Sequence, residues 1–230
     1  MKNHLKLIAA PKTWFVPRKK NVFILRPSPG AHSLEYGMPL GFLLRDELKV
    51  ASTMGEARKI ISNKEVLIDG VARTDHRFIV GLFDVLSVPK LNKQYRMLLD
   101  KKGRLRLTEI NAKEASIKLV KIVGKTVLKE GKIQFNLHDG RNIISDAKAQ
   151  VGDTFMVALP AVKVTKIFSA KKGAKVFLIK GKHAGDVGVL KEIKGVEVTF
   201  TADGADIDTA KDYLFVVGDK DSEINLEQKS

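Results

Sequence analysis

The side chains that most often perform catalysis or bind metals are few and scattered in this chain of 230 residues. There is no cysteine, which excludes thiolate nucleophiles, thiolate zinc sites and disulfide bonds. No two histidines stand at metal-ligand spacing, so each is expected to be a polar surface or partner-facing residue. The histidines are His4, His32, His76, His138 and His183. No Ser/His/Asp set or carboxylate pair follows from spacing, so we predict no catalytic residue, no metal site and no cofactor.

One segment matches a nucleotide-binding loop in part. Gly124-Lys125-Thr126 has the end of the phosphate-binding pattern, which also needs a glycine five positions before Gly124. That position is Leu119, and the surrounding stretch is rich in β-type residues with no following helix. We therefore expect no nucleotide site here.

The charge of the chain points to an anionic partner. Lys and Arg number 41 against 26 Asp and Glu, which gives a formal charge of +15. The N-terminal thirty residues are the most basic part and contain no acidic residue, whereas the last thirty are acidic. Such charge gives a strong, sequence-independent attraction to nucleic-acid phosphates. No segment pairs a basic face with a strongly apolar one, and no apolar run approaches the ~18 residues of a membrane span, so we expect no membrane partner.

A pair of short helices is predicted from residue 40 onward. Leucines at helical spacing mark a first helix over residues 40–48, with Arg45 and Lys49 off its apolar face. The segment 53–56, Thr-Met-Gly-Glu, is a capping box that starts a second helix. Arg58 and Lys59 face outward on this helix.

A small hairpin is expected to follow the helices. Asn63 is a stop signal for the second helix, and Val-Leu-Ile at 66–68 then leads into a tight turn at Asp69-Gly70. A last strand is expected over residues 83–88. The predicted unit thus has two cationic helices packed on a small sheet.

This order of residues resembles the S-four domain, a small RNA-binding fold. The resemblance covers about fifty residues and implies RNA contacts from Arg45, Lys49, Arg58, Lys59 and Lys64. The alternative is a generic helix–helix–hairpin unit whose cations only face water. Pseudouridine synthases with an S-four domain carry a downstream Gly-Arg-Leu-Asp motif with a catalytic aspartate. The segment 103–106 reads Gly-Arg-Leu-Arg, so Arg106 replaces that aspartate and the enzyme class is not supported.

Residues 1–40 are predicted to be an irregular basic arm. Five prolines prevent a long helix, and cations lie beside two adjacent aromatic residues, Trp14 and Phe15. We expect the arm to fold only on RNA, and its removal up to residue 30 to leave the domains intact. Trp14 could stack on an unpaired base or, equally, pack into a neighbouring core. The candidate RNA contacts here are Lys12, Trp14, Arg18, Lys19, Lys20, Arg26 and His32.

The rest of the chain is predicted to be mainly β. Residues 93–168 alternate apolar and polar residues and form an all-β middle domain. Residues 169–217 resemble the KOW motif of small SH3-like barrels, with a glycine-bounded loop that brings Lys180, Lys182 and His183 toward RNA. Residues 218–230 form an acidic tail that is expected to be solvated and mobile.

The order of these parts defines an α+β multidomain protein and resembles the S-four-e family of archaeal and eukaryotic small-subunit ribosomal proteins. Its units are an arm (1–40), an S-four-type domain (41–92), the β domain (93–168), the barrel (169–217) and the tail (218–230). The resemblance covers nearly the whole chain and includes the opening from Leu5 to Trp14. It implies a cytoplasmic structural component of the small ribosomal subunit. Its partners would be small-subunit ribosomal RNA and neighbouring ribosomal proteins. The alternative is a transcription or ribosome-assembly factor built from the same modules.

Overall fold

The chain folds into two compact units. The computed structural model describes residues 4–202 and 204–226. Of these, the first unit comprises residues 4–98 and 104–115, and the second comprises 99–103, 116–202 and 204–226. Strands dominate both units and helices are few, which confirms the α+β class in this general form. No helix among the described residues is both long enough and apolar enough to cross a membrane.

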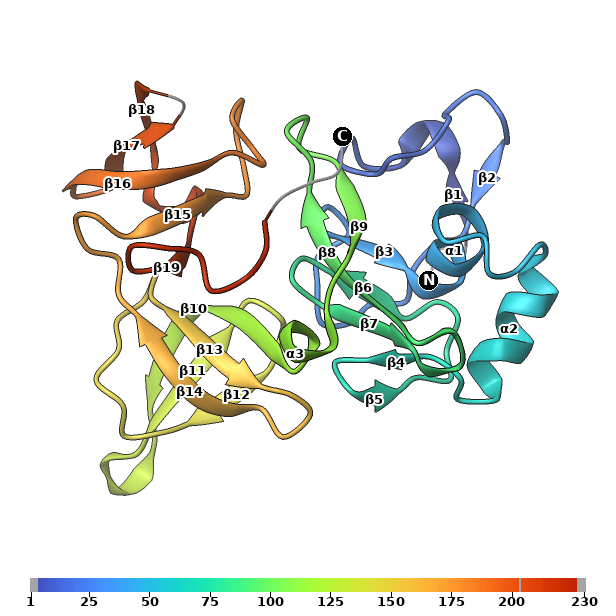
Figure 1. Ribbon diagram of the computed structural model, residues 1–230, viewed down its shortest axis with the longest axis horizontal. Helices are drawn as coiled ribbons and strands as arrows, with labels where there is room; N and C mark the ends of the chain where they lie inside the picture. The colour runs from blue at the N-terminus through green and yellow to red at the C-terminus, as the bar shows by residue number, and fades with distance from the viewer. Residues whose placement is uncertain (1–3, 203, 227–230) are drawn as a thin grey trace. The chain divides into compact units, whose positions relative to one another are not determined.

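A five-stranded sheet with the order β5-β4-β7-β8-β9 is the base of the first unit (Figure 1). Its strands are β4 (Leu67–Ile68), β5 (Val71–Ala72), β7 (Val85–Val88), β8 (Lys93–Leu99) and β9 (Leu105–Glu109). The predicted turn joins β4 to β5, and Asp69 and Gly70 both have positive φ, at 52° and 76°. The 3-10 helix η3 (Pro89–Leu91) connects β7 to β8.

The predicted helix pair is present and packs through its apolar residues. The first helix begins as α1 (Leu40–Phe42) and continues as a π-helical turn, η2 (Leu43–Glu47). The second, α2 (Met54–Ser62), begins with the predicted capping box: Glu56 N–H donates to Thr53 Oγ1 at 3.2 Å, and the Glu56 carboxylate accepts from Thr53 N–H. Because Ala57 and Ile61 are fully buried, the helix is fixed with its charged side outward.

Residues 4–40 are part of the first unit, and the prediction of a separate disordered arm is wrong for them. β1 (Leu5–Lys6) pairs with β2 (Phe23–Ile24), and the 3-10 helix η1 (Leu7–Ala9) follows β1. β3 (Gly37–Pro39) pairs with β6 (Ile79–Gly81). Leu5, Leu7, Trp14 and Ile24 are buried, and this apolar contact offsets the entropy of ordering an irregular segment. Removing residues 1–30 would therefore expose the core.

The second unit contains a β-rich middle sheet with the order β12-β11-β10-β13-β14. Its strands are β10 (Ile117–Val127), β11 (Ile133–Leu137), β12 (Asn142–Ile144), β13 (Thr154–Ala158) and β14 (Lys163–Phe168). The long strand β10 has a bulge between Ile122 and Gly124, so it can pair with both β11 and β13. Phe135 and Phe155 lie edge to face, with centroids 5.2 Å apart, in the core beneath this sheet. The 3-10 helix η4 (Lys129–Gly131) joins β10 to β11.

A second five-stranded sheet follows, with the order β18-β17-β16-β15-β19 (Figure 1). Its strands are β15 (Lys175–Leu178), β16 (Val187–Lys194), β17 (Glu197–Ala202), β18 (Ala205–Ala210) and β19 (Leu214–Gly218). The 3-10 helix η5 (Lys211–Tyr213) precedes β19, which returns to pair with β15.

Two segments differ from the expected organisation. β8 and β9 fall in the segment assigned to the middle domain, but they belong to the sheet of the first unit, because β8 pairs with β7 through a short turn. The short helix α3 (Ala112–Ala115) ends this unit. The acidic tail is also more ordered than expected up to residue 226: Ile224 is buried and Glu223 N–H donates to Val217 O at 3.2 Å. Residues 227–230 of the tail lie outside the described part.

Candidate nucleic-acid interface

A cluster of exposed cations in the first unit lies on and just after α2. The helix buries Ala57 and Ile61, which leaves Arg58 and Lys59 exposed. Lys64 follows the helix in a left-handed conformation with φ of 59°, and its side chain is also exposed. Glu56, the acidic residue in the first turn, is held by the capping box through Ser52 and Thr53 N–H. The α2 surface, defined as Arg58, Lys59 and Lys64, therefore keeps its positive charge for a partner.

The loop after β5 adds a cation that sequence reasoning did not select. Burial lowers the pKa of His76, the charge of Arg58 lowers it further, and Asp75 acts in the opposite direction. Arg77 also lowers this pKa, which shows that Arg58 and Arg77 both lie close to the imidazole. The lowered pKa of His76 favours the neutral imidazole, so the positive side chains at this loop are those of Arg58 and Arg77. The signal in the sequence was the pair of arginines, Arg73 and Arg77, in the loop just beyond the predicted hairpin.

The two cations predicted on the first helix differ in availability. Arg45 is half-buried, and its Nε and Nη2 each lie 2.7 Å from Asp46 Oδ2. This neighbour neutralises part of its charge. Lys49 is exposed, with φ of 54°, at the end of the helix. Lys49 is thus the better candidate to contact a phosphate.

The N-terminal cations divide in the same way. Lys12, Lys19 and Lys20 are exposed. Arg18 instead donates to its own segment, with Nη1 2.8 Å from Ala10 O and Nη2 2.7 Å from Pro11 O. Arg26 is half-buried, and its carbonyl accepts from Arg77 Nε at 3.0 Å. The three lysines are exposed and can contact a phosphate, whereas the guanidinium of Arg18 is held by its own segment.

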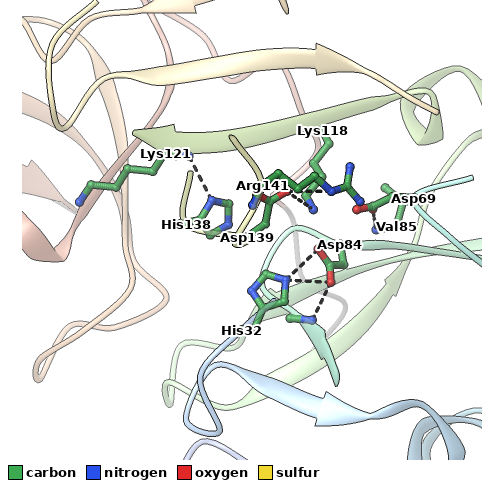
Figure 2. A network of polar contacts seen from close by, with 10 residues as sticks. His32, Asp69, Asp84, Val85, Lys118, Lys121, His138, Asp139 and Arg141 are labelled. Atoms are coloured by element: carbon green, nitrogen blue, oxygen red, sulfur yellow. Dashed lines mark hydrogen bonds and ion pairs between the residues drawn. The ribbon is translucent and has the colours of Figure 1, made fainter. Parts of the chain in front are cut away.

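Two residues predicted to contact RNA lie in the core, and those predictions are wrong. Trp14 is only 2% exposed; its indole Nε1 donates to Leu34 O at 3.1 Å and its ring stacks on Phe42. His32 is buried, with Nε2 3.0 Å from Asp84 Oδ2, and Asp84 in turn accepts from Gly81 N–H at 2.8 Å (Figure 2). Both side chains have internal partners that satisfy their polar atoms, so neither can reach a base.

The loop between β15 and β16 is exposed at its cations. Lys180 and Lys182 lie at the surface, and Gly181 and Gly185 have φ of 89° and 97°, which L side chains rarely adopt. His183 Nδ1 lies 3.2 Å from Asp186 Oδ2, so this histidine is oriented by the loop itself. The structure therefore brings the three predicted residues of this loop onto one short exposed segment.

Other polar residues of the second unit are buried and serve the fold. Lys118 Nζ lies 3.1 Å from Asp139 Oδ2, and both side chains are 1% exposed (Figure 2). Burial opposes ionisation of Asp139, but Lys118 outweighs it and the pKa of the carboxyl is lowered. Lys121 Nζ donates to the carbonyls of Asp212 and Leu214 at 2.9 and 2.7 Å, and burial lowers its pKa to about 8. The amino groups of both lysines are held inside the second unit and do not face a partner.

A pair of short helices on a small sheet, with exposed cations on the second helix, is the arrangement of an S4-type domain. The chain adds two further five-stranded sheets to it. The sequence models of known families agree: an S4 domain matches residues 41–86, an RS4NT domain residues 1–35, and Ribosomal family S4e residues 91–164.

Full-length relatives make the match more specific. The small ribosomal subunit protein eS4 of Methanocella arvoryzae is 42% identical over 96% of this chain and 95% of its own length. That of Archaeoglobus fulgidus is 44% identical with the same coverage, and that of Methanocaldococcus jannaschii is 41% identical over 98% of each chain. The crystal structure of 30S ribosomal protein S4e from Thermoplasma acidophilum superposes with a TM-score of 0.72 at 29% identity, covering 84% of this chain and 99% of that one. The chain belongs to ribosomal family S4e.

Proposed function

We propose that this chain is a structural component of the small ribosomal subunit and binds its ribosomal RNA in the cytoplasm. The observation that carries the proposal is identity of about 40% over nearly the full length with archaeal proteins named small ribosomal subunit protein eS4. The exposed cations of the α2 surface, with no acidic residue between positions 57 and 64, support it. Neighbouring ribosomal proteins are the second class of partner.

The proposed mechanism is neutralisation of RNA phosphates. Each Lys or Arg that contacts a phosphate releases condensed counterions, which favours binding and makes it depend on salt. Double-stranded RNA is recognised mainly by shape and backbone, so a fixed array of cations suits it better than base-reading side chains. The proposed contacts are Lys12, Lys19, Lys20, Arg26, Arg45, Lys49, Arg58, Lys59, Lys64, Lys180, Lys182 and His183. Arg77 joins them because of its position beside Arg58.

The proposed roles differ between the parts of the chain. The S4-type domain and the N-terminal segment would make the main RNA contacts. The β-rich middle domain would support them, and residues 169–217 would act as a KOW-type, SH3-like barrel with a second RNA contact at its 180–185 loop. Residues 218–226 are acidic and partly buried, so we propose that they pack against the second unit and do not contact RNA. The role is binding without catalysis.

Sedimentation of native lysate in a high-salt sucrose gradient tests the proposal. A structural component is expected near one copy per mature small subunit, because it stays bound when loosely held factors are released. Recovery of the chain only as free protein or on precursor particles would overturn the structural role. That result would instead favour an assembly or transcription factor.

A further inference from the structure

The segment Gly103–Arg106, which the proposed RNA contacts leave out, lies beside the one exposed aromatic ring of the Trp14-Phe15 pair. Thr13 O accepts from Leu105 N–H at 2.7 Å, and Trp14 forms a parallel bridge with Leu105. Residues 13–15 therefore run along the outer edge of β9. Successive side chains of an extended chain point to opposite faces. The register thus buries Trp14 and Leu105, and leaves Phe15 and the two arginines on the other side.

On that side the three side chains are close together. The Arg106 guanidinium carbon lies 3.5 Å from the centroid of the Phe15 ring, and that of Arg104 lies 5.7 Å from it. The first distance is van der Waals contact between a guanidinium and a ring face. Phe15 remains 38% exposed, and the Arg106 side chain is 39% exposed. A flat, cationic and partly aromatic surface is therefore open to solvent.

One carboxylate orients the set without neutralising it fully. Glu47 Oε1 lies 3.3 Å from Arg106 Nη1, and this glutamate is more buried than the arginine that it holds. Arg104 adds a second positive charge next to the ring, so two cations face one acid. Glu47 comes from η2, so the helix pair of the S4-type domain fixes the orientation of Arg106.

We propose that Phe15, Arg104 and Arg106 form a binding site for one unpaired nucleotide of ribosomal RNA. The base would stack on the Arg106–Phe15 pair, because guanidinium planes and aromatic rings both stack on bases that are splayed out of a helix. Arg104 would contact the adjacent phosphate as a charged hydrogen-bond donor. The inference rests on the proposed RNA-binding function and adds to it a site that contacts a base, in contrast to the phosphate-binding α2 surface.

Cross-linking in the full chain locates the nucleotide. The aryl azide p-azidophenylalanine at position 15 keeps the ring, and the probe RNA is a full-length small-subunit ribosomal RNA transcript. Irradiation is expected to give reverse-transcription stops at one unpaired nucleotide. Stops only at paired nucleotides, or no cross-link while the RNA remains bound, would overturn the inference. So would a cross-link in assembled subunits that goes only to a neighbouring protein.

Two conservative variants separate stacking from charge. Phe15→Leu and Arg106→Lys keep apolar volume or charge but remove a flat surface. Each is expected to weaken binding to the same transcript roughly tenfold with an unchanged salt slope. Phe23→Leu is the matched control, because Phe23 is 55% exposed on β2, lies opposite Lys6 and contacts the His4 ring edge to face. Circular dichroism melting curves check that all three variants fold.

The outcomes also separate this site from the wider function. If the unaltered chain does not bind the transcript, the proposed function fails. If it binds, and loses affinity when the α2 surface is changed but not with Phe15→Leu or Arg106→Lys, the nucleotide site alone is wrong.

Discussion

The lysines and arginines of α2 and those of β10 show how the same residue types serve opposite purposes in one basic chain. Arg58 and Lys59 on α2 are exposed, and Arg58 and Arg77 both lie near His76. Lys118 and Lys121 on β10 are buried or nearly so, and each donates to an internal oxygen. The net charge of +15 therefore overstates what is available to RNA, and burial decides which cations count.

Removing one partner of the buried Lys118–Asp139 ion pair should have the largest effect on stability. Lys118→Ala leaves the buried Asp139 carboxylate with the longer contact to Arg141 Nε at 3.6 Å, so we expect the free energy of unfolding to fall by about 3 kcal/mol, the lower end for a broken buried pair. Chemical denaturation monitored by circular dichroism measures it. The paired variant Lys118→Met with Asp139→Leu should lose less, because it removes both charges. A single variant as stable as the unaltered chain would show that the pair is not needed for folding.

Removing the cations of the helix pair should weaken RNA binding and leave the stability of the fold nearly unchanged. Replacing Arg45, Lys49, Arg58 and Lys59 with Ala should lower the log–log salt slope by about 0.7–0.9 for each lost phosphate contact. Filter binding to the small-subunit RNA transcript from about 50 to 300 mM salt measures this slope. The unfolding free energy should change by less than about 0.5 kcal/mol per site. If the variant binds the transcript as the unaltered chain does across this salt range, these four cations do not contact RNA.

Lys121 on β10 should make the stability of the fold depend on pH. Its pKa is about 8 in the folded chain against an ordinary value of 10.5, so the unfolded chain binds more protons between these values. The contribution of Lys121 should therefore stabilise the fold progressively as the pH rises from about 8 to about 10.5. Thermal melts of the unaltered chain and of Lys121→Met across this range isolate the effect. Parallel pH profiles for the two proteins would contradict the assignment.

The smallest effect is expected at the start of α2, where one side chain supports the exposed surface without contacting RNA. Thr53→Ala removes the hydroxyl that accepts from Glu56 N–H, and should cost about 1 kcal/mol of stability. Thr53→Ser keeps the hydroxyl and serves as the control in the same denaturation experiment. Weaker RNA binding by Thr53→Ala at full stability would show that the threonine contacts RNA directly.

Local signals in the sequence predicted local structure well. The capping box at Thr53 and the turn at Asp69-Gly70 depend on hydrogen bonds and backbone conformations that neighbouring residues determine, and both are present. The exposed cations of α2 followed from the same helical periodicity. These features need no information from distant parts of the chain.

Partners far apart in sequence explain what could not be predicted. Trp14 is buried because Phe42, Leu34 and β9 surround it, and none of these contacts leaves a pattern near residue 14. His32 is satisfied by Asp84, more than fifty residues away. The assignment of β8 to the first unit likewise depends on strand pairing across a turn. Cations beside an aromatic residue therefore suggested RNA contact, but only the tertiary structure separates Trp14 from Phe15.

The pairing of β15 with β19 has a consequence for synthesis of the chain. Lys175 pairs with Gly218 and Leu178 with Leu214, so β15 cannot complete its pairing until β16, β17, β18 and then β19 have been synthesised. Contacts between distant residues require a long loop to close first, which slows folding. Until β19 has been synthesised, one edge of β15, which contains Val176 and Phe177, has no partner strand. This stretch is where a nascent chain would be most exposed to premature aggregation.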